Sequence, residues 1–286
     1  MKKVLLSSNP YRDKNFRMLR QARQILEAEG VECSVCLVFE VEQKTDLPDD
    51  IRFCDVETGL RDAELLICFG GDGTVLHASK AATRAGIPVL GVNIGNMGYL
   101  AEVDSADLGS LRRLATDDYF LERRMMLQVQ VHRDGELIHE DIALNDAVVT
   151  KSAVARTVHL SVSSDSQQPI TLSGDGVIVC TPTGSTAYCM SAGGPLVEPT
   201  ARCIVVTPIC SHDLMSKSFV LGAGRTVSVR SARPNRKTAY LSVDGGRTVR
   251  LLNNDVVTIC QSSYDTQFLR LRDRSMFEII NAKFKK

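Results

Sequence analysis

The feature that most constrains this fold is a glycine-rich turn between an apolar run and a helical pattern. Residues 65–69 are apolar and lead into Gly70-Gly71-Asp72-Gly73-Thr74, and a helix is predicted over residues 74–85. Glycines let a backbone come close to a ligand, and a helix N-terminus suits a phosphate. A carboxylate in the middle of such a turn repels phosphate, and this conflict is resolved if Asp72 faces a substrate hydroxyl or Mg²⁺. The pattern therefore favours a functional loop over a plain turn, and the absence of GxxxxGK[ST] excludes a P-loop enzyme.

The first 120 residues alternate between strand and helix patterns. Apolar periodicity predicts strands at 4–6, 31–39, 63–69 and 87–92, and helices at 15–29 and 74–85. Such alternation indicates a parallel sheet covered by helices. A second glycine cluster, Gly91 to Leu100, also follows a strand. Both clusters would lie at the carboxyl edge of the sheet, where α/β folds bind ligands, although a structural loop explains the second cluster equally well.

The pattern changes after Leu121 to many short strands rich in Val, Ile, Thr and Leu. They are predicted at 126–133, 136–150, 157–163, 176–181, 202–207, 226–230, 239–243, 247–252 and 255–261, and a last helix at 275–284. We therefore expect two domains, an α/β domain over residues 1–120 and a β-rich domain over residues 121–261.

Two polar sequence segments stand out within this β-rich region. Asn145-Asp146 lies within a predicted strand that is otherwise apolar, and the pair needs partners if it is buried, unless it forms an exposed turn. Residues 173–195 contain a strand between Gly174-Asp175-Gly176 and a run of hydroxyl-bearing and glycine residues. Its small side chains would accept a nucleotide, with Tyr188 as a stacking or packing surface, whereas the plainer interpretation is a Ser/Thr-rich turn.

Composition limits the partners and the compartment. Lys+Arg and Asp+Glu each total 34, so the net charge is zero and neither nucleic acid nor an anionic membrane is expected as a partner. No apolar stretch is long enough to span a bilayer. Cys33 and Cys36 form the one CxxC among nine cysteines, but on a strand they point to opposite faces, so we expect no structural zinc and free thiols in a reducing compartment. No HExxH or GxSxG pattern supports a metallohydrolase or a serine hydrolase.

Together these motifs resemble the bacterial branch of the NAD kinase family over most of the chain. The Gly-Gly-Asp-Gly-Thr loop is shared with diacylglycerol, sphingosine and phosphofructokinase relatives, whereas the block from Asp175 to Pro195 is specific to the NAD kinases. The resemblance implies an NAD kinase-like two-domain fold in which residues 262–286 return to the first domain and the β-rich domain binds NAD. It implies transfer of the γ-phosphoryl group of ATP, or of polyphosphate, to the 2′-hydroxyl of the adenosine ribose of NAD, giving NADP. A cytoplasmic homodimer or homotetramer that uses Mg²⁺ is expected, with the active site in the cleft between the domains.

The resemblance also assigns roles to individual residues. Asp72 would be the catalytic acceptor of the 2′-hydroxyl proton, with Gly73 and His77 lining the site. The residues implied to bind the dinucleotide are Asn145, Asp146, Arg156, Ser173, Asp175, Thr186, Ala187, Tyr188 and Ser191. No metal-ligating set of side chains is expected.

The chain departs from the family at few positions, and two alternatives stay open. The family has Asn-Glu where this chain has Asn145-Asp146, a carboxylate one methylene shorter, and Leu is commoner at Met97. A lipid kinase would share the glycine-rich loop, but it predicts membrane association, which this neutral chain does not indicate. A nucleotide sensor without turnover would have no need of a proton acceptor at Asp72.

Overall fold

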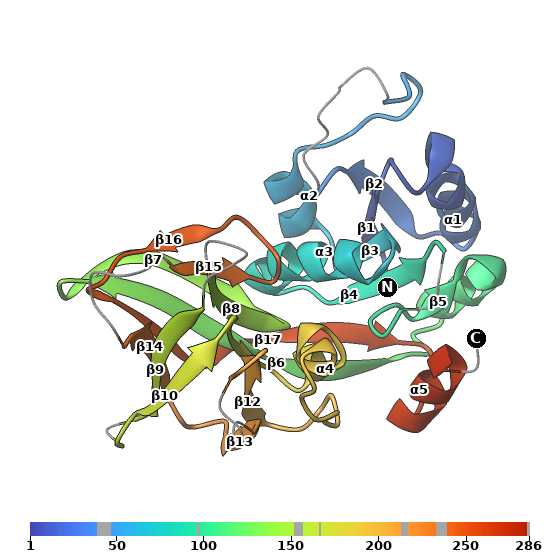
Figure 1. Cartoon of the computed structure of the whole chain (residues 1–286). Helices are drawn as coiled ribbons and strands as arrows, with labels where there is room; N and C mark the ends of the chain where they lie inside the picture. The colour runs from blue at the N-terminus through green and yellow to red at the C-terminus, as the bar shows by residue number, and fades with distance from the viewer. Residues whose placement is uncertain are drawn as a thin grey trace. The chain divides into compact units, whose positions relative to one another are not determined.

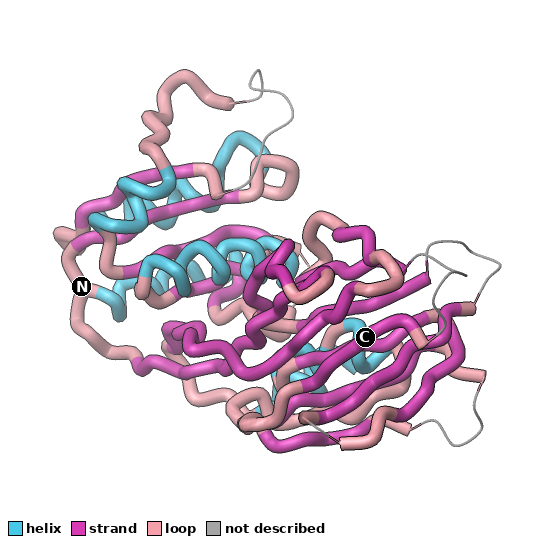
Figure 2. Tube along the Cα trace, turned by 90° about the vertical axis from the view of Figure 1, so that its left-hand side faces the viewer, coloured by secondary structure: helices cyan, strands magenta, loops and turns pink. Residues whose placement is uncertain are grey.

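The computed structural model describes residues 1–38, 47–95, 98–151, 157–165, 167–212, 217–232 and 239–284. The chain divides into two compact units, each described by itself below. Unit 1 comprises Met1–Arg123 and Thr266–Lys286, and unit 2 comprises Arg124–Asp265. Helices gather in unit 1, whereas unit 2 is almost entirely strand (Figures 1 and 2). No helix in the described part of the chain is long and apolar enough to cross a membrane.

Unit 1 is built on a parallel sheet. Its strands are β1 (Lys3–Ser8), β2 (Glu32–Cys36), β3 (Leu65–Gly70) and β4 (Val89–Asn93), in the order β2-β1-β3-β4. The short β5 (Val103–Asp104) and the end of β17 (Asp255–Arg270) also pair in parallel with β4. Every residue of β3 and β4 is buried, as expected for central strands covered on both faces.

Helices complete unit 1 in two packed pairs. The helix α1 (Arg17–Ala28) packs against the 3-10 segment η3 (Ser105–Leu114), and α2 (Val56–Asp62) packs against α3 (Asp72–Ala85). A short turn η1 (Lys14–Phe16) precedes α1, and α5 (Met276–Phe284) ends the described chain. From β1 the chain continues to β2 on one side and then crosses to β3 on the other side of β1. The carboxyl ends of β1 and β3 are therefore the topological switch point, where such sheets bind ligands.

Unit 2 contains two antiparallel layers. One has β10 (Ile170–Gly174), β9 (Val158–Ser164), β14 (Val227–Ser231) and β17, with β6 (Phe120–Arg133) joining β17 to β7 (Glu136–Ala143). The other has the order β13-β12-β11-β8-β15-β16; its strands are Phe219–Gly222, Cys203–Ile209, Gly176–Cys180, Asp146–Lys151, Ala239–Val243 and Val249–Leu251. Buried side chains from both layers, such as Leu127, Val179 and Ile259, form one apolar core. A 3-10 turn η4 (Thr183–Thr186) and the single-turn α4 (Tyr188–Ser191) follow β11.

The α/β plus β-rich fold class predicted from sequence is confirmed, but some elements differ. One strand was expected over residues 136–150, whereas β7 and β8 are separate strands in different sheets, with Leu144-Asn145 between them. The ladder stops there because the side chain of Asp244 accepts the backbone N–H groups of residues 144–146. The strand predicted at 255–261 continues to Arg270 because it pairs first with β14 and then with β4. The helix α2, capped by Asp55, was not predicted.

Candidate active site

The Gly-Gly-Asp-Gly-Thr turn lies at the switch point of unit 1. β3 ends at Gly70, Gly71 is the N-cap, and α3 begins at Asp72, two residues earlier than the sequence pattern predicted. A Cβ on Gly70 would collide with the side chain of Thr74, so packing alone requires glycine at that position. Gly73 is exposed and a Cβ there would meet nothing within 4 Å, so packing does not explain this glycine. A glycine in open space is compatible with close approach of a ligand to the backbone.

The half-buried carboxylate of Asp72 joins the two glycine clusters. It accepts N–H groups from Tyr99 at 2.7 Å and from Leu100 at 3.0 Å. A Cβ on Gly98 would occupy the position of this carboxylate, so the second cluster needs a glycine to admit Asp72. The second cluster therefore fixes the orientation of the carboxylate.

A lysine from the end of α5 also reaches this carboxylate. Lys283 Nζ lies 3.9 Å from Asp72 Oδ2 and 3.5 Å from the centroid of the Tyr99 ring. Burial lowers the pKa of Lys283, and the charge of Asp72 partly opposes this shift. Burial, and then Asp72, raise the pKa of Tyr99. The returning C-terminal segment thus contributes a cation to the site.

The loop after β1 is a part of this edge that sequence analysis did not identify. Asn9 donates from its side chain to Thr74 Oγ1 at 3.3 Å and from its backbone to Phe69 O at 3.0 Å. The guanidinium of Arg12 lies close to both glycine clusters, because a Cβ on Gly95 would be 3.6 Å from Arg12 Nη1 and one on Gly71 would be 3.9 Å away. In the sequence, the Asn9-Pro10 pair directly after a strand of the same sheet is a turn signal that could have indicated this loop.

His77, placed in the site by resemblance, lies on the exposed surface of α3 one turn after Asp72. Its Nε2 atom is 3.2 Å from the carbonyl oxygen of Val38. The imidazole therefore has a polar partner in unit 1 before any substrate is considered.

In unit 2, Asn145 and Asp146 lie where the chain passes from β7 to β8. Asn145 is half-buried and Asp146 is 6% exposed. Burial raises the pKa of Asp146 to about 7, and the neighbouring charges of Asp244 and Cys189 contribute to the shift. Asp146 is therefore poised between its carboxyl and carboxylate forms near neutral pH.

The sequence block after β11 packs directly on this point. Thr181 donates its hydroxyl to Leu144 O at 2.5 Å and its N–H to Asn145 O at 2.9 Å, and its hydroxyl accepts the N–H of Gly184 at 3.0 Å. A Cβ on Gly184 would collide with the backbone of Asn145. In the sequence only the family resemblance connects these two motifs, and the structure brings them into contact.

The remaining predicted residues of this block differ in exposure. Thr186 donates its hydroxyl to Thr183 O at 3.1 Å, Ala187 is half-buried, and Ser191 is exposed. Tyr188 is 44% exposed, so part of this residue is open to solvent, whereas the adjacent Cys189 is fully buried. The exposed positions and the hydroxyl groups fit the predicted nucleotide surface.

Ser173 lies in β10 and Asp175 lies between β10 and β11, and each has a partner. Ser173 Oγ is 2.7 Å from His159 Nδ1, and Ser173 O accepts the backbone N–H of His212 at 2.8 Å. Asp175 forms a 2.6 Å ion pair with Lys151, a residue that sequence analysis did not identify. Arg156 lies outside the described residues.

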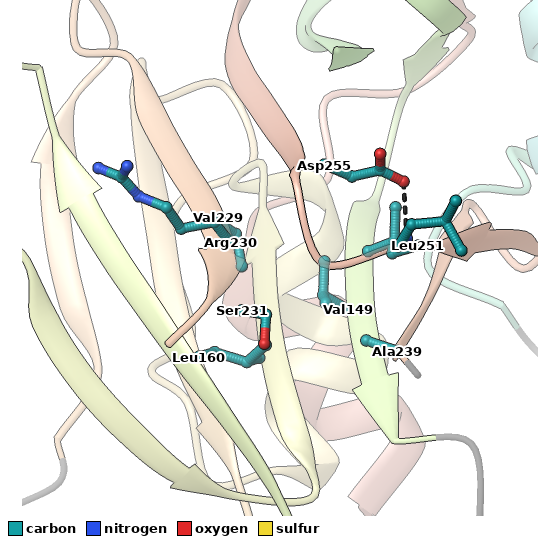
Figure 3. A pocket seen from close by; sticks show the side chains of 9 residues that line it. Val149, Leu160, Val229, Arg230, Ser231, Ala239, Leu251 and Asp255 are labelled. Atoms are coloured by element: carbon teal, nitrogen blue, oxygen red, sulfur yellow. Dashed lines mark hydrogen bonds between the residues drawn. The ribbon is translucent and has the colours of Figure 1, made fainter. Parts of the chain in front are cut away.

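A small cavity between the two layers of unit 2 is separate from these residues (Figure 3). Its volume is about 10 Å³, which is space for one water molecule. The lining is mostly apolar, and Asp255 at its rim accepts the N–H of Leu252 at 2.8 Å. The cavity cannot hold a nucleotide and belongs to the core.

An α/β unit with a Gly-Gly-Asp-Gly turn at its switch point, together with a β-rich unit, fits the class of kinase that the sequence resembles. The ATP-NAD kinase N-terminal domain model matches residues 8–119, and the ATP-NAD kinase C-terminal domain model matches residues 123–271. The chain belongs to the ATP-NAD kinase family. It is a phosphotransferase that phosphorylates NAD to NADP, as the sequence predicted.

Relatives match this chain along most of its length. An NAD kinase of Ruminiclostridium cellulolyticum is 31% identical over 99% of this chain and 98% of its own length. One of Acetivibrio thermocellus is 40% identical over 77% of each chain. Among solved structures, a yeast NADH kinase complexed with NADH has a TM-score of 0.83 at 21% identity, covering 98% of this chain and 86% of that one. An Archaeoglobus fulgidus NAD kinase in complex with ATP has a TM-score of 0.76 at 23% identity, covering 99% of both.

Proposed function

We propose that this chain transfers the γ-phosphoryl group of ATP to the 2′-hydroxyl of the adenosine ribose of NAD, with Mg²⁺, as a cytoplasmic homodimer or homotetramer. The observation that carries the proposal is the fixed carboxylate of Asp72 at the N-terminus of α3, in a chain that matches both ATP-NAD kinase domains. The ATP in the Archaeoglobus structure and the NADH in the yeast structure support the choice of donor and acceptor.

Asp72 is assigned the role of general base. Two backbone N–H groups hold its carboxylate in one orientation, which is what positioned proton transfer requires. Carboxylate oxygens have about four acceptor positions, so two amide donors leave capacity for a substrate hydroxyl. Lys283 adds a nearby positive charge, with its Nζ 3.9 Å from Asp72 Oδ2.

The donor phosphates are assigned to the switch-point edge of unit 1. Phosphoryl transfer asks the protein mainly for positioning and charge neutralisation. The first N–H groups of α3, the open backbone at Gly73 and the guanidinium of Arg12 supply both.

Mg²⁺ fits this arrangement as an ion that enters with ATP. No group of three or more metal-ligating side chains occurs among the residues that the structure describes. Kinases usually hold Mg²⁺ through substrate phosphates together with one or two carboxylates, so Mg²⁺ would bind mainly to the phosphates of ATP here, and Asp72 keeps its assigned role of general base. The ion would neutralise charge on the donor phosphates, while the protein residues orient the reacting groups.

The dinucleotide is assigned to unit 2. Asn145 and Asp146 offer an amide and a carboxyl group to ribose hydroxyls, and the exposed ring of Tyr188 offers a stacking surface to a base. Ser173, Asp175, Thr186, Ala187 and Ser191 are assigned to the same ligand. The lipid-kinase alternative has no counterpart for this set.

The test is a product assay with the purified chain, ATP and Mg²⁺, in which NAD, diacylglycerol and a sphingoid base compete in one mixture. NADP⁺ is read out with an NADP-dependent dehydrogenase, and ³¹P NMR identifies the 2′-phosphate. The proposal predicts ADP and NADP⁺ as the products, with neither lipid phosphorylated. Phosphorylation of a lipid with no NADP⁺ would establish the alternative.

A further inference from the structure

Asp244 makes four hydrogen bonds to the segment that carries Asn145 and Asp146. Its carboxylate accepts N–H groups from Leu144 and Asn145 at 2.8 Å and from Asp146 at 3.0 Å, and its own N–H donates to Asp146 O at 2.9 Å. Asp244 itself has φ of 51°, in the left-handed region that aspartate tolerates better than most residues. These contacts link the turn after β15 to the start of β8.

We propose that Asp244 is a positioning residue of the dinucleotide site, whose carboxylate holds the backbone of residues 144–146 so that the Asn145 and Asp146 side chains meet the ribose. The inference deepens the proposed function and rests on it for the identity of the ligand. Asp244 itself is not assigned a contact with substrate.

The carboxylate is the chemical group that this geometry requires. Three consecutive N–H groups converge on two oxygens, which is an anion-binding arrangement of backbone. An amide in place of the carboxylate has one acceptor oxygen, and its NH₂ group would face a donor. The Asp244→Asn substitution therefore leaves at least one buried N–H without an acceptor, and we expect the backbone of residues 144–146 to shift.

The charge of Asp244 also affects the pKa of Asp146. The titratable groups that face Asp146 are Asp244 after β15, Cys189 on α4 and Cys180, its partner in the register of β11. Burial and the charge of Asp244 both raise the pKa of Asp146, so removal of that charge lowers this pKa. The pH at which Asp146 changes from hydrogen-bond donor to acceptor then moves downward from about 7.

The experiment compares the full-length wild type with Asp244→Asn and with Asp165→Asn. Asp165 is a matched control because it also has positive φ, 53°, and its carboxylate accepts the backbone N–H of Thr226 at 3.0 Å, in a turn that carries no assigned site residue. Asp244→Asn should raise KM for NAD by about 5- to 150-fold, with KM for ATP within about twofold of wild type. In the pH profile of kcat/KM for NAD, the inflection near neutral pH should move to a lower pH in Asp244→Asn. Asp165→Asn should change none of these.

A spectroscopic arm separates this inference from the proposed function. The side-chain carboxyl of Asp146, labelled with ¹³C, is titrated in wild type and Asp244→Asn without substrate, and its midpoint should fall in the variant. If wild type fails to phosphorylate NAD, the proposed function fails, and this titration still tests the link between Asp244 and Asp146. Asp244→Gly, which suits the positive φ and also lacks the charge, is the second variant. The proposal would be overturned if the Asp244 variants kept the wild-type KM for NAD and the wild-type titration midpoint of Asp146. It would also be overturned if Asp165→Asn changed these quantities equally, or if neither Asp244 variant folded.

Discussion

Single glycines in the turn after β3 have different physical causes. Gly70 is required by the side chain of Thr74, which fills the space of a Cβ, whereas Gly73 has open space around it. Gly73 also lies inside α3, where glycine is less favourable than alanine. A residue that costs helix stability and relieves no clash is expected where a ligand approaches the backbone.

Gly73→Ala should therefore separate folding from function. We expect the free energy of unfolding to stay the same or rise by up to about 1 kcal/mol, because alanine favours the helix. We expect kcat/KM for ATP to fall at least about tenfold, because the added methyl group occupies the space assigned to a phosphate. Thermal melting and steady-state kinetics measure the two effects, and unchanged kinetics would show that no ligand approaches Gly73.

At the scale of elements, the orientation of Asp72 depends on the segment after β4. Tyr99 and Leu100 donate their N–H groups to its carboxylate, and Leu100 O in turn accepts from Arg270 Nη1 of β17 at 3.1 Å. Glu102 accepts the N–H groups of Leu271 and Arg272 at 3.0 Å, which fixes the same segment to the end of β17. The end of β17 and the residues after it therefore position the segment after β4, and this segment positions the carboxylate of Asp72.

Gly98→Ala tests this dependence without removing any polar group. A Cβ at position 98 would overlap the Asp72 carboxylate, so we expect the carboxylate to move and kcat to fall by about 10²-fold or more, as for a lost general base. Gly222→Ala is the matched control, since a Cβ there meets nothing within 4 Å. Turnover of Gly98→Ala equal to that of the control would show that the position of Asp72 is unimportant for catalysis.

Patterns within one element were readable from the sequence, and contacts between distant segments were not. Apolar periodicity predicted β3, β4 and α3, and glycine chemistry identified the turn at Asp72. Asp244 and Lys283 are 99 and 211 residues from Asn145 and Asp72, respectively, in the sequence, and nothing local marks them. The break between β7 and β8 was missed for the same reason, because its cause is the distant carboxylate of Asp244.

At the scale of the whole molecule, the residues with proposed roles fall in both units. Unit 1 carries the proposed base and the phosphate-binding backbone, and unit 2 carries the proposed dinucleotide contacts. Each unit has its own apolar core, so a substitution in one site is expected to leave the other unit folded. Kinetic constants for different substrates should therefore respond separately to substitutions in the two units.

The most direct test of this division compares kcat and KM for NAD in full-length Asp72→Asn and Asp146→Ala. Asp72→Asn cannot accept a proton at neutral pH, and we expect kcat to fall about 10²- to 10⁴-fold with KM for NAD nearly unchanged. Asparagine also gives up one acceptor for Tyr99 or Leu100, so the melting temperature is measured alongside. Asp146→Ala should raise KM for NAD by about 5- to 150-fold with a smaller change in kcat. Wild-type turnover in a folded Asp72→Asn, or an unchanged KM in Asp146→Ala, would contradict the account.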